Sequence, residues 1–224
     1  MVRAEGINKH YGDFHALKNV SLDIKQGEIV SIVGASGAGK TTLLQILGTL
    51  QNPDSGDIFY DNTNVRNLSS KQLARFRNEH IGFVFQFHHL LPEFNSLENV
   101  CIPGYIYTRS KRSVEERAKE LLNFLGLSER MEHKPSELSG GEKQRVAIAR
   151  ALINKPSVVL ADEPSGNLDS NNTQELYGLI LSLREKYNQT FIIVTHNNDL
   201  ANVSDRILIM KDGEIIDETR GIGG

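Results

Sequence analysis

Apolar residues along the chain fall into short continuous runs and into longer stretches with helical spacing. The short runs, which predict buried strands, are 29–33, 81–85, 158–163 and 190–194. Ahead of them, Val20, Leu22 and Ile24 alternate with polar residues, so we expect short, half-buried strands before residue 29. Strands and helices thus follow one another in the order of an α/β protein.

A long helical stretch interrupts this series of strands. From residue 96 to about residue 154 the apolar positions have helical spacing, and they predict one helix at 115–125. We therefore expect a single domain over residues 1–224, with a helical subdomain at about 88–155 inserted between core strands.

A glycine-rich segment follows the first apolar run and fits the pattern G-x-x-x-x-G-K-[ST] of the phosphate-binding P-loop. Its glycines let backbone N–H groups converge on phosphate oxygens, and the next helix begins there with its positive end. Lys40 would reach the β- and γ-phosphates, and the Thr41 hydroxyl would bind Mg²⁺. The candidate phosphate-binding residues are Gly34, Ala35, Ser36, Gly37, Ala38, Gly39, Lys40, Thr41 and Thr42. The motif alone indicates a nucleoside triphosphate, because kinases, GTPases and ATP-driven machines share it.

Two acids end the apolar run 158–163. A strand this apolar is not expected to end in two uncompensated acids unless the acids have a function. Asp162 would hold Mg²⁺, through water or directly, and Glu163 would polarise the attacking water as general base.

Polar side chains also follow two other predicted strands, where ligands bind in α/β sheets. Gln86 could orient a water or touch the γ-phosphate and Mg²⁺, but a hydrogen-bonded structural glutamine fits equally well. His196 could donate a hydrogen bond to the γ-phosphate, although a core histidine is the simpler interpretation from chemistry alone. Tyr11 could stack on an adenine, and there too an ordinary surface or core tyrosine is favoured.

A second candidate anion site begins at Ser139. Ser139 and Glu142 have the spacing of a capping box, and Gly140 and Gly141 lie between them at a helix start. An ordinary capped helix would explain the pattern, but the backbone N–H groups of such a helix start could also meet a triphosphate.

Residues 87–94 mix aromatic, histidine and leucine side chains without strand or helix periodicity. Adjacent His88 and His89 point apart on a strand or helix, so a metal site is not expected. An exposed apolar cluster more often contacts a partner. Cys101, the single cysteine, is expected to be a buried small hydrophobe.

Composition narrows the classes further. The chain has 39% hydrophobic and 24% charged residues and a formal net charge of −3, which does not suggest nucleic acid. It shows no signal-peptide pattern and no apolar run long enough to span a bilayer. We therefore expect a cytoplasmic protein without direct membrane insertion, for which any membrane role requires a partner.

Together, in this order and spacing, the motifs resemble those of the nucleotide-binding subunits of ATP-binding-cassette (ABC) transporters over nearly the whole chain. The resemblance makes Tyr11 the adenine-stacking aromatic, 34–41 the Walker A loop and Gln86 the Q-loop glutamine. Residues 138–142 match the signature motif, which is the most specific of the set because it separates this family from other P-loop proteins.

The later motifs fit the same family. Asp162 and Glu163 match its Walker B pair, 165–169 its D-loop, and His196 its switch histidine. The resemblance implies an ATPase that uses ATP and Mg²⁺. Its fold would be a P-loop NTPase core, a RecA-like mixed sheet with an N-terminal antiparallel β subdomain, plus the inserted helical subdomain.

The resemblance also implies partners. Two copies would face each other head to tail, with the ATP on one P-loop covered by Ser139, Gly140 and Gly141 of the other copy. Integral membrane subunits would receive the motion of the ATP cycle through the stretch after Gln86.

A finer resemblance rests on residues 85–94, on 96–100 and on the D-loop, which are similar to the LolD-type ATPases of lipoprotein-releasing systems. That branch works at the cytoplasmic side of the bacterial inner membrane as a peripheral subunit. Macrolide-exporter-type and FtsE-type cell-division ATPases share much of the pattern and remain alternatives. Soluble ABC proteins of DNA repair or translation need insertions or a second cassette, for which 224 residues leave no room.

Overall fold

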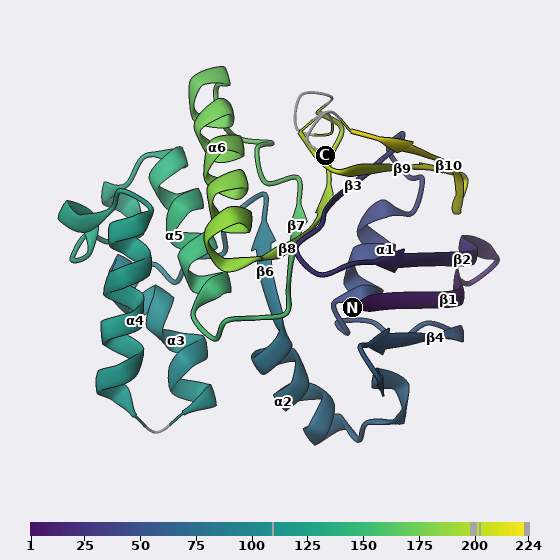
Figure 1. The fold of residues 1–224 in the computed structure, drawn as a ribbon, viewed down its shortest axis with the longest axis horizontal. Coiled ribbons are helices and arrows are strands. Elements are labelled where there is room, and N and C mark those ends of the chain that lie inside the picture. The colour runs from purple at the N-terminus through teal and green to yellow at the C-terminus, as the bar shows by residue number, and fades with distance from the viewer. Residues whose placement is uncertain (109, 198–200, 202, 222–224) are drawn as a thin grey trace. The chain divides into compact units, whose positions relative to one another are not determined.

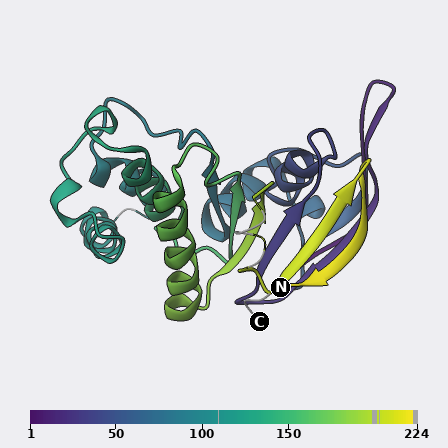
Figure 2. The same ribbon diagram turned by 90° about the horizontal axis from the view of Figure 1, so that it is seen from above.

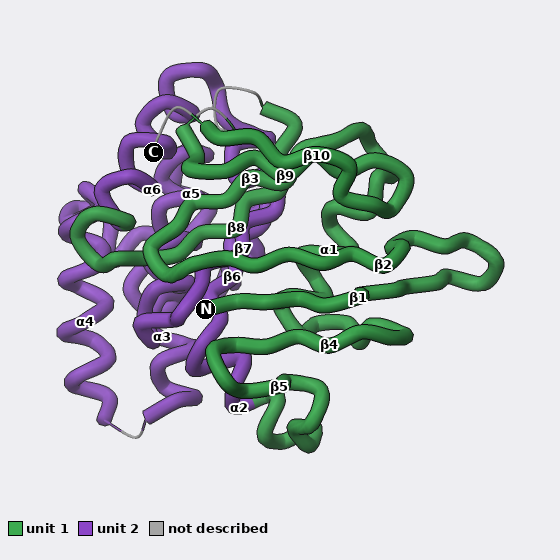
Figure 3. The backbone as a smooth tube through the Cα atoms, turned by 45° about the vertical axis from the view of Figure 1, so that its right-hand side comes forward, with its two compact units in different colours: residues 1–74, 184–224 green, residues 75–183 purple. Residues whose placement is uncertain are grey.

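The computed structural model describes residues 1–108, 110–197, 201 and 203–221. The chain forms two compact units, residues 1–74 with 184–224 (unit 1) and residues 75–183 (unit 2), which Figure 3 colours separately.

The N-terminal part of unit 1 is an antiparallel sheet with the strand order β2-β1-β4-β5. Its strands are β1 (Val2–Tyr11), β2 (Phe14–Ile24), β4 (Ser55–Tyr60) and β5 (Thr63–Asn64), and a 3-10 turn (Val65–Asn67) follows them. The expectation of short strands was wrong, because β1 and β2 contain 10 and 11 residues. Register shifts between Ala4 and Ile7, and again near Lys9, break the period-two alternation inside β1 and hide its length in the sequence.

The rest of unit 1 is a mixed set of strands around α1 (Lys40–Leu47). β3 (Ile29–Val33) is parallel to both β8 (Thr190–Val194) and β9 (Arg206–Lys211), and β9 turns back antiparallel into β10 (Glu214–Arg220). β8 is buried along its whole length and β3 along all but its last residue, which confirms the prediction from their continuous apolar runs. Figure 2 shows the yellow β9–β10 hairpin beside the purple N-terminal strands.

Unit 2 contains the parallel pair β6 (Ile81–Phe85) and β7 (Val158–Asp162). Between them in the chain come α3 (Ser96–Tyr107), α4 (Lys111–Phe124) and α5 (Gly140–Leu152), with 3-10 turns at Ser128–Arg130 and Pro135–Glu137. α2 (Ser70–His80) leads into β6, and α6 (Ser170–Tyr187) follows β7. The three inserted helices pack on one another, and Figure 1 shows α3 and α4 side by side.

The core among these helices matches the apolar spacing of the sequence. Ala118, Leu121 and Leu122 of α4 are fully buried, so the predicted helical face is confirmed, although the helix begins at Lys111 rather than at residue 115. Cys101 of α3 is fully buried as expected, and burial raises the pKa of its thiol. In the part of the chain that the structure describes, no helix has the length and hydrophobicity that crossing a bilayer requires.

Candidate functional site

The residues singled out from the sequence divide between the two units. Unit 1 contains Tyr11, the P-loop residues Gly34, Ala35, Ser36, Gly37, Ala38, Gly39, Lys40, Thr41 and Thr42, and His196. Unit 2 contains Gln86, Ser139, Gly140, Gly141, Asp162 and Glu163.

In the P-loop, the Lys40 side chain folds back onto the backbone of the loop. The Lys40 ammonium donates hydrogen bonds to the carbonyl oxygens of Gly34 at 2.8 Å and Ala35 at 2.9 Å. Ala35, Ser36 and Gly37 are exposed, so the open side of the loop faces solvent. The Lys40 ammonium is therefore held over a loop of backbone groups that a phosphate can reach.

The start of α1 is built to leave its positive end open to an anion. Gly39 is the N-cap, has a φ of 100°, and offers no side chain to the helix start. A Cβ there would lie 2.7 Å from the carbonyl oxygen of Ala16, so backbone strain and crowding both require glycine. The first turn consists of Lys40, Thr41 and Thr42 and carries no acid to neutralise the helix dipole.

His196 lies at the same edge of the strands as the P-loop. The parallel register pairs Ile32 of β3 with Val194 of β8, and the Thr195 N–H donates to the Ile32 carbonyl at 3.2 Å. Thr195 is fully buried, but His196 is exposed. The interpretation of His196 as a core histidine is therefore wrong.

Tyr11 ends β1, and its side chain is 46% exposed. The Tyr11 hydroxyl donates to Gln51 Oε1 at 2.5 Å, and Gln51 Nε2 donates to Gln45 Oε1 at 2.8 Å. Gln45 lies on α1, so two side-chain hydrogen bonds connect the tyrosine to the P-loop helix. Gln51 and Gln45 were not predicted from the sequence, because no periodic pattern relates them to Tyr11.

In unit 2 the structure brings Gln86 and the acidic pair to one edge. Phe85 and Asp162 are register partners on the parallel strands β6 and β7, so Gln86 and Glu163 each follow an aligned strand end. Glu163 has a φ of 46°, a left-handed conformation that is uncommon outside glycine. Its carbonyl accepts from the Gly166 N–H at 3.0 Å, which turns the chain sharply after β7.

The capping box predicted at Ser139 is confirmed. Ser139 Oγ accepts from the Glu142 N–H at 3.2 Å, and Glu142 Oε2 accepts from the Ser139 N–H at 2.8 Å. Arg130 also pairs with Glu142 at 2.8 Å. The backbone hydrogen bond from Ser139, with help from Arg130, lowers the pKa of Glu142 to about 2.

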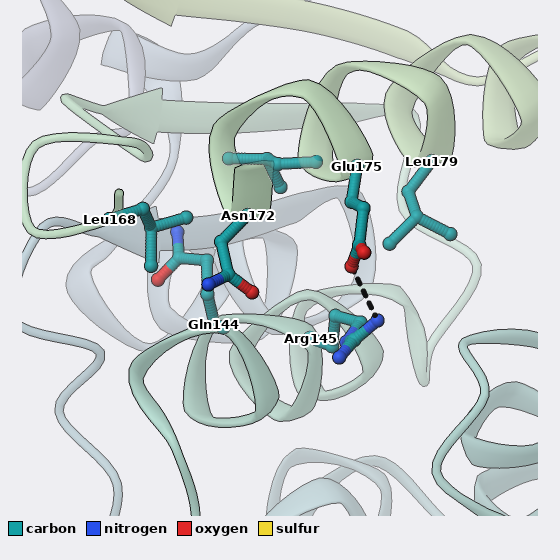
Figure 4. A pocket seen from close by; sticks show the side chains of 8 residues that line it. Gln144, Arg145, Leu168, Asn172, Glu175 and Leu179 are labelled. Atoms are coloured by element: carbon teal, nitrogen blue, oxygen red, sulfur yellow. Dashed lines mark hydrogen bonds and ion pairs between the residues drawn. The ribbon is translucent and has the colours of Figure 1, made fainter. Parts of the chain in front are cut away.

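The start of α5 packs closely against the start of α6. A Cβ on Gly141 would lie 2.3 Å from Asn172 Oδ1, so the asparagine fills the space that a side chain would need. Figure 4 shows the small pocket beside this contact, with the ion pair of Arg145 and Glu175 at 3.3 Å across it. Gln144 lines the pocket and is 1% exposed, and within the described residues its amide atoms have no hydrogen-bond partner.

The histidine pair after Gln86 belongs to a tight turn. His88 and His89 have φ values of 60° and 48°, and Arg150 of α5 donates to both of their carbonyl oxygens at 2.6 Å. Burial, with the nearby charges of Lys143 and Arg150, lowers the pKa of His88. Across the described ranges, no group of three or more histidine, cysteine or acidic side chains is placed to hold a metal.

Apolar side chains are exposed on the turn and loop that follow Gln86. Phe87 is 71% exposed, and Leu91 and Phe94 are about 40% exposed. The fully buried Asn99 holds this loop, because its Nδ2 lies within 3.1 Å of the carbonyl oxygens of Leu91 and Phe94 and its Oδ1 accepts from the Leu91 N–H at 2.8 Å. The apolar side chains therefore stand on an anchored loop. The sequence predicted the exposed cluster but not Asn99 or Arg150.

Comparisons with known proteins agree with this arrangement. Residues 17–166 match the family described as "ABC transporter". The lipoprotein-releasing system ATP-binding protein LolD of Bacteroides fragilis (strain YCH46) is 60% identical over 216 residues, covering 96% of this chain and all of that protein. LolD of Porphyromonas gingivalis (strain ATCC BAA-308 / W83) is 54% identical, covering 97% of this chain and all of that protein.

Two solved structures of MJ0796, a bacterial ABC transporter cassette, are similar in fold. Its dimeric structure has a TM-score of 0.88 and 40% identity and covers 98% of each chain. The dimeric post-hydrolysis state bound to ADP and Pi has a TM-score of 0.89 and 41% identity, again over 98% of each chain.

Proposed function

Because the chain belongs to the ABC transporter family and resembles LolD-type ATP-binding proteins over nearly its full length, we propose that it is the ATP-hydrolysing subunit of a lipoprotein-releasing transporter. The observation that carries this proposal is the 60% identity to a LolD protein over 96% of the chain. Macrolide-exporter-type and FtsE-type functions are not favoured, because the relatives compared above are named as lipoprotein-releasing subunits.

In unit 1, we assign the nucleotide to the P-loop. Lys40 binds the β- and γ-phosphates, Thr41 offers its hydroxyl to Mg²⁺, and the open N-terminus of α1 stabilises the negative charge. Tyr11 stacks on the adenine, and its partial exposure is consistent with a ring that has one face to offer. His196, exposed at the same strand edge as the P-loop, donates a hydrogen bond to the γ-phosphate.

In unit 2, we assign the remaining polar groups to the metal and the water. Hydroxyl, amide and carboxylate oxygens are the ligands that Mg²⁺ prefers. The parallel register of β6 and β7 places Gln86 and Asp162 at the same edge of this strand pair. Bound Mg²⁺ would neutralise charge on the phosphates. Glu163 accepts the proton of the attacking water.

We assign the start of α5 to a second copy of the chain. Ser139, Gly140 and Gly141 present backbone groups at a capped helix N-terminus, which is a favourable place for an anion. The dimeric MJ0796 structures support a pair of chains, in which the start of α5 of one copy would cover the ATP on the P-loop of the other.

Membrane subunits would complete the transporter. Asn99 holds the loop with the exposed Leu91 and Phe94, and the exposed Phe87 precedes the turn that Arg150 holds. Such an anchored apolar surface suits a protein partner. We place the protein at the cytoplasmic side of the bacterial inner membrane as a peripheral subunit. Within a single domain of residues 1–224, the helical subdomain at about 88–155 would carry this docking surface.

Depletion of the protein in its own cells tests the proposal. We expect lipoproteins to accumulate in the inner membrane, and we expect the unmodified chain to restore their release but Lys40→Ala to fail. Normal lipoprotein release together with a defect in cell division would contradict the proposal and favour the FtsE-type alternative.

A further inference from the structure

Asn167, in the turn between β7 and α6, contacts both the backbone and the side chain of Gln86. Asn167 Nδ2 donates to the backbone carbonyl of Gln86 at 3.0 Å. Gln86 Nε2 points back to Asn167 Oδ1 at 3.4 Å, which is long for a hydrogen bond but correctly oriented. Both residues lie in unit 2, so these contacts are internal to one compact unit.

Gly166 gives the Gln86 side chain a surface to lie on. A Cβ at Gly166 would be 2.8 Å from Gln86 Nε2 and 3.0 Å from Gln86 Cδ. The Gln86 side chain therefore occupies the space beside Gly166 that a side chain at residue 166 would need, within reach of Asn167. With Nε2 directed at Asn167 Oδ1, the oxygen Oε1 at the other corner of the planar amide faces away from Asn167.

The turn that carries Asn167 is itself fixed. The Gly166 N–H donates to the Glu163 carbonyl at 3.0 Å, and the Leu168 N–H donates to the Ser165 carbonyl at 3.0 Å. At its far end, Asp169 Oδ1 accepts from the Asn172 N–H at 2.9 Å and begins α6. Asn167 thus stands on a braced segment that starts at Glu163.

Only an amide of this length satisfies the arrangement. Asparagine supplies a donor for the Gln86 carbonyl and an acceptor for Gln86 Nε2 from one planar group. Aspartate would lose the donor and set a carboxylate against a carbonyl oxygen, and alanine would lose both contacts.

We propose that Asn167 is a positioning residue that holds the Gln86 side chain with its oxygen turned toward the catalytic groups. The inference rests on the role proposed above for Gln86, and it adds that the turn after Glu163 sets the orientation of that glutamine. Asn167 acts through Gln86 and not by contact with the nucleotide or the metal.

The first test observes Gln86 without reference to activity. In ¹H–¹⁵N spectra of the full chain, the side-chain amide signals of Gln86 are assigned by their loss in Gln86→Ala. We expect Asn167→Ala and Asn167→Asp to shift these signals, while Asn171→Ala leaves them in place. Asn171 is a matched control, an exposed asparagine at the start of α6, the helix that follows the turn of Asn167. Unmoved Gln86 signals in both Asn167 variants would overturn the proposal.

The second test is a double-mutant cycle on ATP turnover by the full chain. We expect Asn167→Ala to lower kcat about three- to tenfold with KM for ATP changed less than about twofold, the size of effect of one lost hydrogen bond. In the Gln86→Ala background the same substitution should lower kcat less than about twofold further. An equal loss in both backgrounds would show that Asn167 does not act through Gln86.

The two tests separate the possible failures. Wild-type turnover by Gln86→Ala would overturn the role of Gln86 and the positioning role with it. An unmodified chain without ATP turnover would contradict the proposed function, and the spectra would still decide whether Asn167 holds Gln86.

Discussion

Asn172 Oδ1 occupies the position beside Gly141 where a side chain at residue 141 would begin, 2.3 Å from an ideal Cβ. The two residues lie in the first turns of α6 and α5, and Asn172 is held in place by its hydrogen bond to Asp169 Oδ2 at 2.7 Å. Gly141 therefore has a packing role inside its own chain in addition to the role proposed for it toward a second copy.

Gly141→Ala should accordingly destabilise the protein by about 1–3 kcal/mol, because it overpacks a close contact. Chemical unfolding of the purified chain measures this change. Asn172→Ala in the same background should recover most of the loss by removing the clashing atom. The control is Gly178→Ala on α6, where a Cβ has open space within 4 Å and alanine should be neutral or stabilising. Equal effects at residues 141 and 178 would contradict the packing role.

Glu163→Gln should lower ATP turnover by at least about 100-fold while leaving ATP affinity near that of the unmodified chain, because a general base contributes to the chemical step alone. With ATP bound and hydrolysis blocked, we expect the chain to sediment as a dimer. Glu185→Gln, at an exposed position of α6, serves as the control. A monomer that turns over ATP at the normal rate after Glu163→Gln would refute the assignment.

Gln51→Leu should weaken ATP binding about three- to fivefold, because Tyr11 loses the hydrogen bond that fixes its ring. Affinity for tripolyphosphate, which has no base to stack, should stay the same. Equilibrium binding of both ligands separates a local effect on Tyr11 from general damage to the P-loop. Gln26→Leu, an exposed turn position in unit 1, is the matched control. A parallel loss of affinity for both ligands would rule out an effect through the base.

Glu142 should make stability depend on acid pH in a defined window. Its pKa is lowered to about 2 in the folded chain from an ordinary 4.5, so its contribution is complete above about pH 4.5 and is lost as pH falls toward about 2. Glu142→Gln should lower the free energy of unfolding near neutral pH, and its difference from the unmodified chain should shrink between those two values. Glu129→Gln, an exposed neighbour of Arg130, should show no such dependence. A difference that stays constant down to pH 2 would contradict the contribution of the charge.

The sequence predicted features that depend on local order. Continuous apolar runs identified β3, β6, β7 and β8, and the spacing of Ser139 and Glu142 identified the start of α5. Each of these signals lies within a few neighbouring residues, where strand and helix periods operate. The length of β1 was missed because its register shifts break that period.

The supporting residues could not be predicted in the same way. Arg150 acts on backbone carbonyls 61 and 62 residues away, and Asn167 acts on Gln86 from 81 residues away. These hydrogen bonds go to backbone carbonyl groups, which every residue has, so no residue type in the sequence marks the contacts. Gln51 is closer to Gln45, six residues along, but it lies beyond the end of α1 and so outside the helical period.

The β9–β10 hairpin contributes more to the P-loop than its place near the end of the chain suggests. The Gly213 N–H donates to the Ala38 carbonyl at 3.1 Å, and the Met210 carbonyl closes the space beside Gly34. A chain shortened to residue 205 would keep every motif from Tyr11 to His196 and still lose one wall of its phosphate loop. A fragment of this protein that contains every motif is therefore not guaranteed to bind nucleotide.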